Sequence, residues 1–134
     1  MGKRVMIVDD EPDIREVVKD VLEPFGFDVL TVDCGNKCIE ELQKGFRGVI
    51  LMDIMMPGID GWETIRQIES KGLTEGNIIS MLTAKEDPDT DLSQMTETVL
   101  NYIRKPFKAD YLIATVEKYC GWLEQAQKTQ AVGN

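Results

Sequence analysis

The 134-residue chain has no histidine, only three cysteines and no long apolar run. Without histidine it cannot carry a Ser-His-Asp or Cys-His catalytic site or an HExxH zinc site. Cys34, Cys38 and Cys120 are odd in number and lack metal-site spacing, so we expect reduced thiols. Any chemistry must therefore use carboxylates, lysine, threonine and the backbone.

Basic charge is also scarce, because 15 Lys and Arg face 24 Asp and Glu, a net charge of -9. This balance argues against direct binding of nucleic acid or an anionic membrane and favours a cationic partner or a divalent metal. No apolar run approaches the roughly 18 residues of a membrane span. The N-terminus also lacks a signal-peptide pattern. We therefore expect a cytoplasmic protein.

Five short apolar runs alternate with segments of helical spacing, and three of the runs are almost unbroken, as in strands buried on both faces of a parallel sheet. The runs cover residues 5–8, 29–32, 49–52, 78–82 and 99–103. The helical segments cover residues 14–25, 39–46, 62–68, 87–98 and 112–123. This alternation predicts an α/β fold, a doubly wound parallel sheet of five strands with five helices. Residues 1–127 would form one domain, and the aperiodic residues 128–134 a flexible C-terminal tail.

Charged and polar residues follow the predicted strands at their carboxyl ends, where doubly wound sheets place ligand chemistry. Asp9 and Asp10 follow the first strand, Asp53 ends the third, Thr83 ends the fourth and Lys105 follows the fifth. Each alone has a simpler explanation, such as a helix cap, a turn acid or a surface lysine. Together they would meet at one edge, where three clustered carboxylates need a cation. Hard oxygen ligands in small number suit Mg²⁺, so a joint metal and phosphate site is predicted.

These segments resemble the receiver domains of two-component response regulators. The resemblance lies in residues 5–11 (VMIVDDE), 51–61 (LMDIMMPGIDG), 82–84 (LTA) and 102–107 (YIRKPF), and it spans roughly residues 4–124. No single motif is decisive, but the ordered set is specific. The resemblance implies a flavodoxin-like sheet with strand order 2-1-3-4-5.

The resemblance also implies roles for the acidic residues. Asp53 would accept a phosphoryl group from a phosphohistidine. Asp10, Asp53 and the backbone carbonyl of Met55 would bind Mg²⁺ directly, and Asp9 would act through a metal-bound water. Lys105 would pair with a phosphoryl oxygen.

A switch is implied as well. Thr83 would move to bond the phosphoryl group, and Tyr102 would turn from an outward to an inward position. The readout face would comprise the fourth helix, the fifth strand and the fifth helix. The bond between Lys105 and Pro106 would be cis, which proline allows.

The implied function is a signalling switch rather than an enzyme with a substrate of its own, although it would catalyse its own phosphoryl transfer and dephosphorylation. Its partners would be a sensor histidine kinase or phosphotransfer protein and an unidentified downstream protein. It would be a monomer that could dimerise on phosphorylation.

Three alternative functions compete with this one. An aspartyl phosphatase of the haloacid-dehalogenase type needs a second Asp where Met55 stands. A flavin module needs a phosphate loop where the acids Asp9 and Asp10 stand. The main alternative is a receiver-fold interaction module that works without phosphorylation.

Overall fold

The computed structural model describes residues 3–83 and 98–132, with side chains for all of these except Thr83 and residues 127–132. Five strands and four α-helices alternate along these ranges. The strands are β1 (Arg4–Val8), β2 (Asp28–Val32), β3 (Val49–Asp53), β4 (Ile78–Thr83) and β5 (Val99–Arg104). The helices are α1 (Pro12–Leu22), α2 (Gly35–Gln43), α3 (Gly61–Ser70) and α4 (Ala109–Val132).

All five strands run parallel in the order β2-β1-β3-β4-β5, which confirms the predicted doubly wound fold. Val8 pairs with Met52, and Met52 pairs with Met81, so β1, β3 and β4 end at the same edge of the sheet. The strand order reverses between β1 and β3, the point where such sheets bind ligands.

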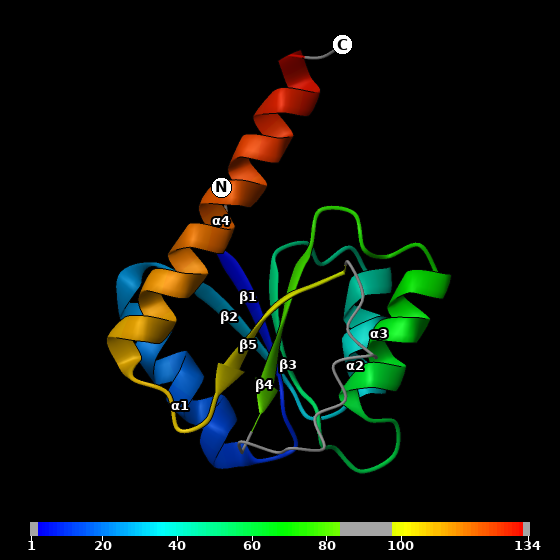
Figure 1. The fold of residues 1–134 in the computed structure, drawn as a ribbon, viewed down its shortest axis with the longest axis vertical. Coiled ribbons are helices and arrows are strands. Elements are labelled where there is room, and N and C mark those ends of the chain that lie inside the picture. The colour runs from blue at the N-terminus through cyan, green and yellow to red at the C-terminus, as the bar shows by residue number, and fades with distance from the viewer. Residues whose placement is uncertain (1–2, 84–97, 133–134) are drawn as a thin grey trace.

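Helices cover both faces of the sheet, with α1 and α4 on one face and α2 and α3 on the other (Figure 1). Each face has its own apolar core because side chains alternate along a strand. Val5 and Ile7 of β1 pack with α1 and α4, whereas Met6 and Val8 pack with α2 and α3. Burial on both faces explains the unbroken apolar runs in the central strands.

The first helix ends earlier than its apolar stripe predicted. Helix α1 stops at Leu22, and a short 3-10 turn, η1 (Glu23–Phe25), follows before Gly26 with φ of 89°. Pro24 explains the break, since proline has no N–H to continue the helical ladder. Phe25, which the stripe placed on the buried face, is 53% exposed.

The last helix is longer than predicted and continues to Val132, past the amino ends of the strands (Figure 1). The backbone of residues 128–132 is therefore helical, where the sequence predicted an irregular tail. The sequence Gln-Ala-Gln-Lys at 125–128 explains this, because these residues have good helix propensity and need no apolar stripe. Helix α4 is the fifth predicted helix. The fourth, over 87–98, falls almost wholly outside the described residues.

Among the described residues, no helix is both long enough and apolar enough to cross a membrane.

Candidate functional site

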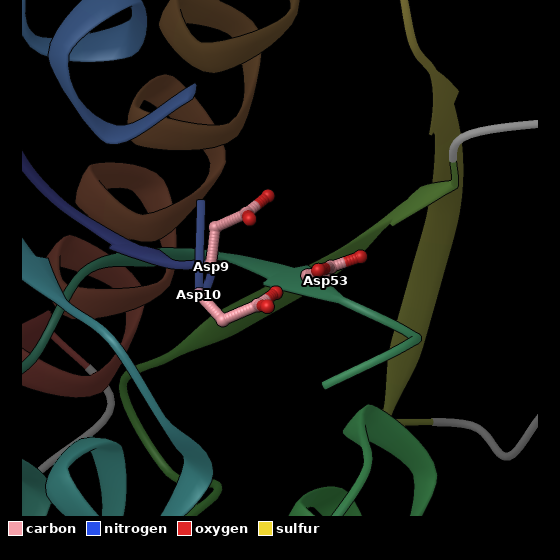
Figure 2. Close-up of side chains that lie close together, drawn as sticks. All are labelled: Asp9, Asp10 and Asp53. Carbon is pink, nitrogen blue, oxygen red and sulfur yellow. The ribbon is translucent and has the colours of Figure 1, made fainter. Parts of the chain in front are cut away.

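Three aspartates meet at the carboxyl edge of the sheet. Asp9 and Asp10 directly follow β1, and Asp53 is the last residue of the adjacent strand β3. One carboxylate oxygen from each lies within 4.8 Å of the others. Figure 2 shows the three side chains converging from the two strand ends. The predicted convergence of these acids is confirmed.

Asp9 is the most enclosed of the three and is held from several sides. Its side chain is fully buried. One carboxylate oxygen accepts the backbone N–H of Glu11 at 2.9 Å, and the other accepts Lys105 Nζ at 2.7 Å. Its own backbone N–H donates to the carbonyl of Val32 at 3.2 Å. Asp9 therefore joins the ends of three strands: β1, β2 and, through Lys105, β5.

Lys105 bridges two of the carboxylates, because its Nζ also lies 3.5 Å from Asp53 Oδ1. Burial alone would lower the pKa of Lys105, but the hydrogen bond to Asp9 and the charges of Asp53 and Asp9 outweigh it and raise the pKa above its ordinary value. The ammonium therefore remains charged and partly neutralises the aspartates. The Lys105–Pro106 bond is cis, as the resemblance implied.

The surroundings of Asp53 disfavour its charged form. Burial and, as a smaller cause, the negative charge of Asp9 raise the pKa of Asp53 to about 7 against the opposing effects of Lys105 and the Met55 N–H. The side chain is nearly enclosed, with the residue 4% exposed. A carboxylate in this position gains from any further cation beside it.

Asp10 differs from its neighbours because it reaches solvent. Within residues 3–83 and 98–132, its carboxylate takes part in no hydrogen bond or ion pair. One free and one buried carboxylate at this spacing fit a small hard cation, since oxygens on opposite sides of Mg²⁺ are about 4.2 Å apart and the remaining positions take water. The three aspartates could therefore hold a divalent metal.

Met55, Thr83 and Tyr102 lie around this cluster. The Met55 side chain is 75% exposed, and its backbone N–H favours the charged form of Asp53 by lowering the pKa of that carboxyl. Thr83 ends β4 beside the strand end of Asp53, and its side chain lies outside the described residues. The Tyr102 ring packs edge-on against Trp62, with centroids 6.3 Å apart, and its hydroxyl oxygen is buried. The Tyr102 ring therefore packs against the first turn of α3.

Sequence reasoning missed two residues beside the cluster. Arg15 donates from Nη1 to the backbone carbonyl of Asp9 at 2.8 Å, and no sequence motif predicts this bond. Gly61 begins α3 so close to Asp53 that a Cβ there would collide with the Asp53 carbonyl oxygen. A local signal for Gly61 did exist, because Asp60 and Glu63 have helix-start spacing and Asp60 caps the Glu63 N–H at 2.8 Å.

The fold and the cluster define the class of this protein: a doubly wound α/β domain with three aspartates and a bridging lysine at its strand-order switch point. Residues 5–117 match the family model of the response regulator receiver domain. The chain belongs to this family, and it is a receiver domain of a two-component response regulator.

Solved structures similar to this chain are receiver proteins. A CheY-like response regulator receiver domain protein from Methanospirillum hungatei JF-1 is 46% identical, with a TM-score of 0.84 over 91% of this chain and 97% of that one. The response regulator TrrA from Thermotoga maritima, crystallised in complex with Mg²⁺-BeF, is 34% identical, with a TM-score of 0.75 over 89% of this chain and 99% of that one.

Curated relatives are longer than this chain. The phosphate regulon transcriptional regulatory protein PhoB of Escherichia coli K12 is 30% identical over 117 residues, which are 87% of this chain and 51% of that protein. The chain spans about half the length of the curated relatives that it matches.

Proposed function

We propose that this receiver domain is a phosphorylation switch in which Asp53 accepts a phosphoryl group. The observation that carries the proposal is the convergence of Asp9, Asp10 and Asp53 within 4.8 Å beside Lys105. No simple structural role requires three acids and one ammonium at a strand-order reversal. Phosphoryl transfer does require clustered charge of this kind.

In the proposed reaction, a carboxylate oxygen of Asp53 attacks the phosphorus of a phosphohistidine on a partner. A new P–O bond forms and the P–N bond breaks, and the leaving imidazole keeps the electron pair and takes a proton from water. The product is an acyl phosphate on Asp53. The attacking group must be ionised, which the cations around Asp53 favour over its raised pKa of about 7.

Mg²⁺ is the proposed cofactor, and it would neutralise negative charge on the phosphoryl oxygens. Asp10, Asp53 and the carbonyl of Met55 are its proposed ligands, and Asp9 would act through a water, since both oxygens of Asp9 already accept protein donors. Lys105 would turn from the two carboxylates to a phosphoryl oxygen. The complex of the relative TrrA with Mg²⁺-BeF supports the metal assignment.

The switch itself would use Thr83 and Tyr102. The Thr83 hydroxyl would bond the phosphoryl group, and Tyr102, whose ring contacts Trp62 here, would turn from an outward to an inward position. The bound group would thereby favour one of two conformations through contacts made in that one alone. The proposed readout face comprises β5, α4 and the segment between β4 and β5.

The proposed phosphodonor is a sensor histidine kinase or a phosphotransfer protein, and the output is contact with a downstream protein, with no direct binding of nucleic acid or membrane. The protein would act in the cytoplasm as a monomer that could dimerise when phosphorylated. It would count as a signalling protein and not as an enzyme, although it catalyses its own modification.

Intact mass after incubation with Mg²⁺ and acetyl phosphate tests the proposal. We expect one acid-stable, base-labile phosphoryl adduct that is absent from Asp53→Asn and from samples with EDTA. If neither an adduct nor Mg²⁺ binding is found, the chain is instead an interaction module with a receiver fold. Mg²⁺ binding without an adduct would point to strict dependence on the cognate kinase.

A further inference from the structure

Asp10 offers the most accessible oxygens of the aspartate cluster, and its own side chain does nothing to fix their direction. As described above, that carboxylate has no partner in the parts of the chain that the structure describes. The orientation of the Asp10 carboxylate toward Asp53 must therefore be set by the conformation of the backbone at Asp10. The peptide bond between Asp9 and Asp10 is planar, so the orientation of the Asp9 carbonyl also sets that of the Asp10 amide.

Arg15 holds that carbonyl. Its Nη1 donates to the Asp9 oxygen at 2.8 Å, from one turn inside α1. The other groups of Asp9 are fixed by Val32, Glu11 and Lys105. The carbonyl bond from Arg15 is thus the contact that links α1 to the peptide carrying Asp10.

The guanidinium of Arg15 lies beside the end of β1, where it bonds the Asp9 carbonyl. The pKa of Asp33, which directly follows β2, is lowered first by its hydrogen bond from Lys37 and also, as a smaller cause, by the positive charge of Arg15. Arg15 therefore brings a positive charge close to the carboxylate cluster, and within the described residues it bonds the Asp9 carbonyl rather than any of the three carboxylates. A cation in this place weakens divalent-metal binding by repulsion, so its presence calls for a geometric explanation.

We propose that Arg15 is a positioning residue for the divalent-cation site: through the Asp9 carbonyl it aims the Asp10 carboxylate at Asp53. This rests on the proposed function, which takes the cluster to be a Mg²⁺ site. Mg²⁺ demands near-ideal octahedral geometry, whereas the larger Ca²⁺ tolerates irregular ligands. Loosening Asp10 should therefore harm Mg²⁺ binding more than Ca²⁺ binding.

Titration calorimetry of the full chain with MgCl₂ and with CaCl₂ tests this. Arg15→Met keeps most of the aliphatic stem and removes the donor. We expect its Mg²⁺ affinity to fall about 10-fold, the usual size for loss of a residue that orients a ligand. Its Ca²⁺ affinity should change less than about 2-fold.

Arg47→Met is the matched control. Arg47 also donates Nη1 to backbone carbonyls, those of Phe46 at 2.6 Å and Leu42 at 3.2 Å, but it precedes β3 at the opposite edge of the sheet. Both cation affinities should stay unchanged in this variant.

Three results would overturn the proposal. Mg²⁺ binding of Arg15→Met as tight as or tighter than wild type would make Arg15 only a nearby charge. Equal weakening of both cations with a lower unfolding midpoint would make it only a structural residue. If the wild type binds neither cation, the metal site of the proposed function is wrong, and the role of Arg15 is wrong with it. If the wild type binds Mg²⁺ and Arg15→Met binds it equally well, only the role of Arg15 is wrong.

Discussion

The Asp53 carboxylate is held in a place that favours its protonated form. Its pKa of about 7 lies above the ordinary value of 3.8 because of burial and the nearby Asp9. The proton therefore binds the folded chain more tightly than the unfolded one. The resulting stability is fully present below pH 3.8 and is lost as the pH rises to about 7.

The first prediction follows from this loss of stability as the Asp53 carboxyl ionises. In chelator at pH 8, Asp53→Asn should raise the free energy of unfolding by about 1–3 kcal/mol, allowing about 1.4 kcal/mol per pKa unit and a discount for partial solvation. The gain should shrink toward pH 5. Urea unfolding at both pH values measures it, with the exposed Asp20→Asn as control. A variant less stable than wild type at pH 8 would contradict the assignment.

Met55 gives the second prediction, which concerns the lifetime of the acyl phosphate. Its exposed, apolar side chain follows Asp53 by two residues and offers an attacking water no hydrogen bond. Met55→Asn and Met55→Glu should each hasten hydrolysis several-fold, well below the roughly 10²–10⁴-fold that a fully positioned general base supplies. Met55→Leu should not. Loss of the mass adduct over time gives the rates, and equal rates in all four proteins would refute the idea.

The site residues that could be predicted from the sequence are those that lie at the ends of strands. Asp9, Asp10, Asp53 and Lys105 each border an apolar run, so parallel topology alone brings them together. The bond from Arg15 could not be foreseen, because it depends on how a long side chain folds back over its own helix start. The contact of the Tyr102 ring with Trp62 could not be foreseen either, because the two rings come from different elements.

At the scale of elements, the start of α3 is tightly coupled to the site. Gly61 N–H donates to the Ile54 carbonyl at 2.8 Å, and there is no room for a side chain between the helix and Asp53. The first turn of α3 therefore cannot shift independently of the end of β3.

The third prediction uses this contact. Gly61→Ala should lower the free energy of unfolding by about 1–3 kcal/mol, because the added methyl meets backbone that cannot move aside. Gly121→Ala, in exposed α4 with nothing near its Cβ position, should instead add about 0.5–1 kcal/mol. Chemical denaturation of both proteins checks the opposite signs. A neutral Gly61→Ala would mean that the helix start yields easily.

The elements themselves were largely predictable from periodicity. All five predicted strands were found, with bounds shifted by no more than a residue or so, since buried strands need apolar residues on both faces. Helix ends were less predictable. The apolar stripe of the first helix predicted that it would continue to Phe25, but Pro24 ends the α-helical turns before that residue. The helix propensity of residues 125–128 extends α4 where the sequence has no apolar stripe.

At the scale of the molecule, the first half of α4 supplies the residues of this helix that are buried in the core. Its buried residues, Leu112, Val116, Tyr119 and Cys120, pack with α1 and the sheet, and Leu123 lies partly buried beside them. Beyond that the helix runs past the sheet (Figure 1). We therefore propose that residues 1–127 suffice as the folding unit.

The fourth prediction tests that unit. A chain of residues 1–127 should unfold cooperatively within about 2 °C of the full chain, since a shift of that size is well under 1 kcal/mol for a domain of this length. A chain ending at residue 118 loses Tyr119 and Cys120 and should be destabilised by on the order of 3–5 kcal/mol. Thermal unfolding followed by circular dichroism measures both. If the 1–127 chain were as unstable as the chain ending at residue 118, residues 128–134 would have a structural role.

The two tryptophans mark opposite edges of the sheet and differ in access. Trp62 lies in the first turn of α3 beside Tyr102 and is 4% exposed, whereas Trp122 lies in α4 near the amino ends of β4 and β5 and is 49% exposed. A neutral collisional quencher such as acrylamide should therefore extinguish the emission of Trp122 and spare that of Trp62. The fluorescence that survives would come from a single ring near the acidic edge, which gives the unlabelled protein a built-in optical reporter of events at Asp53.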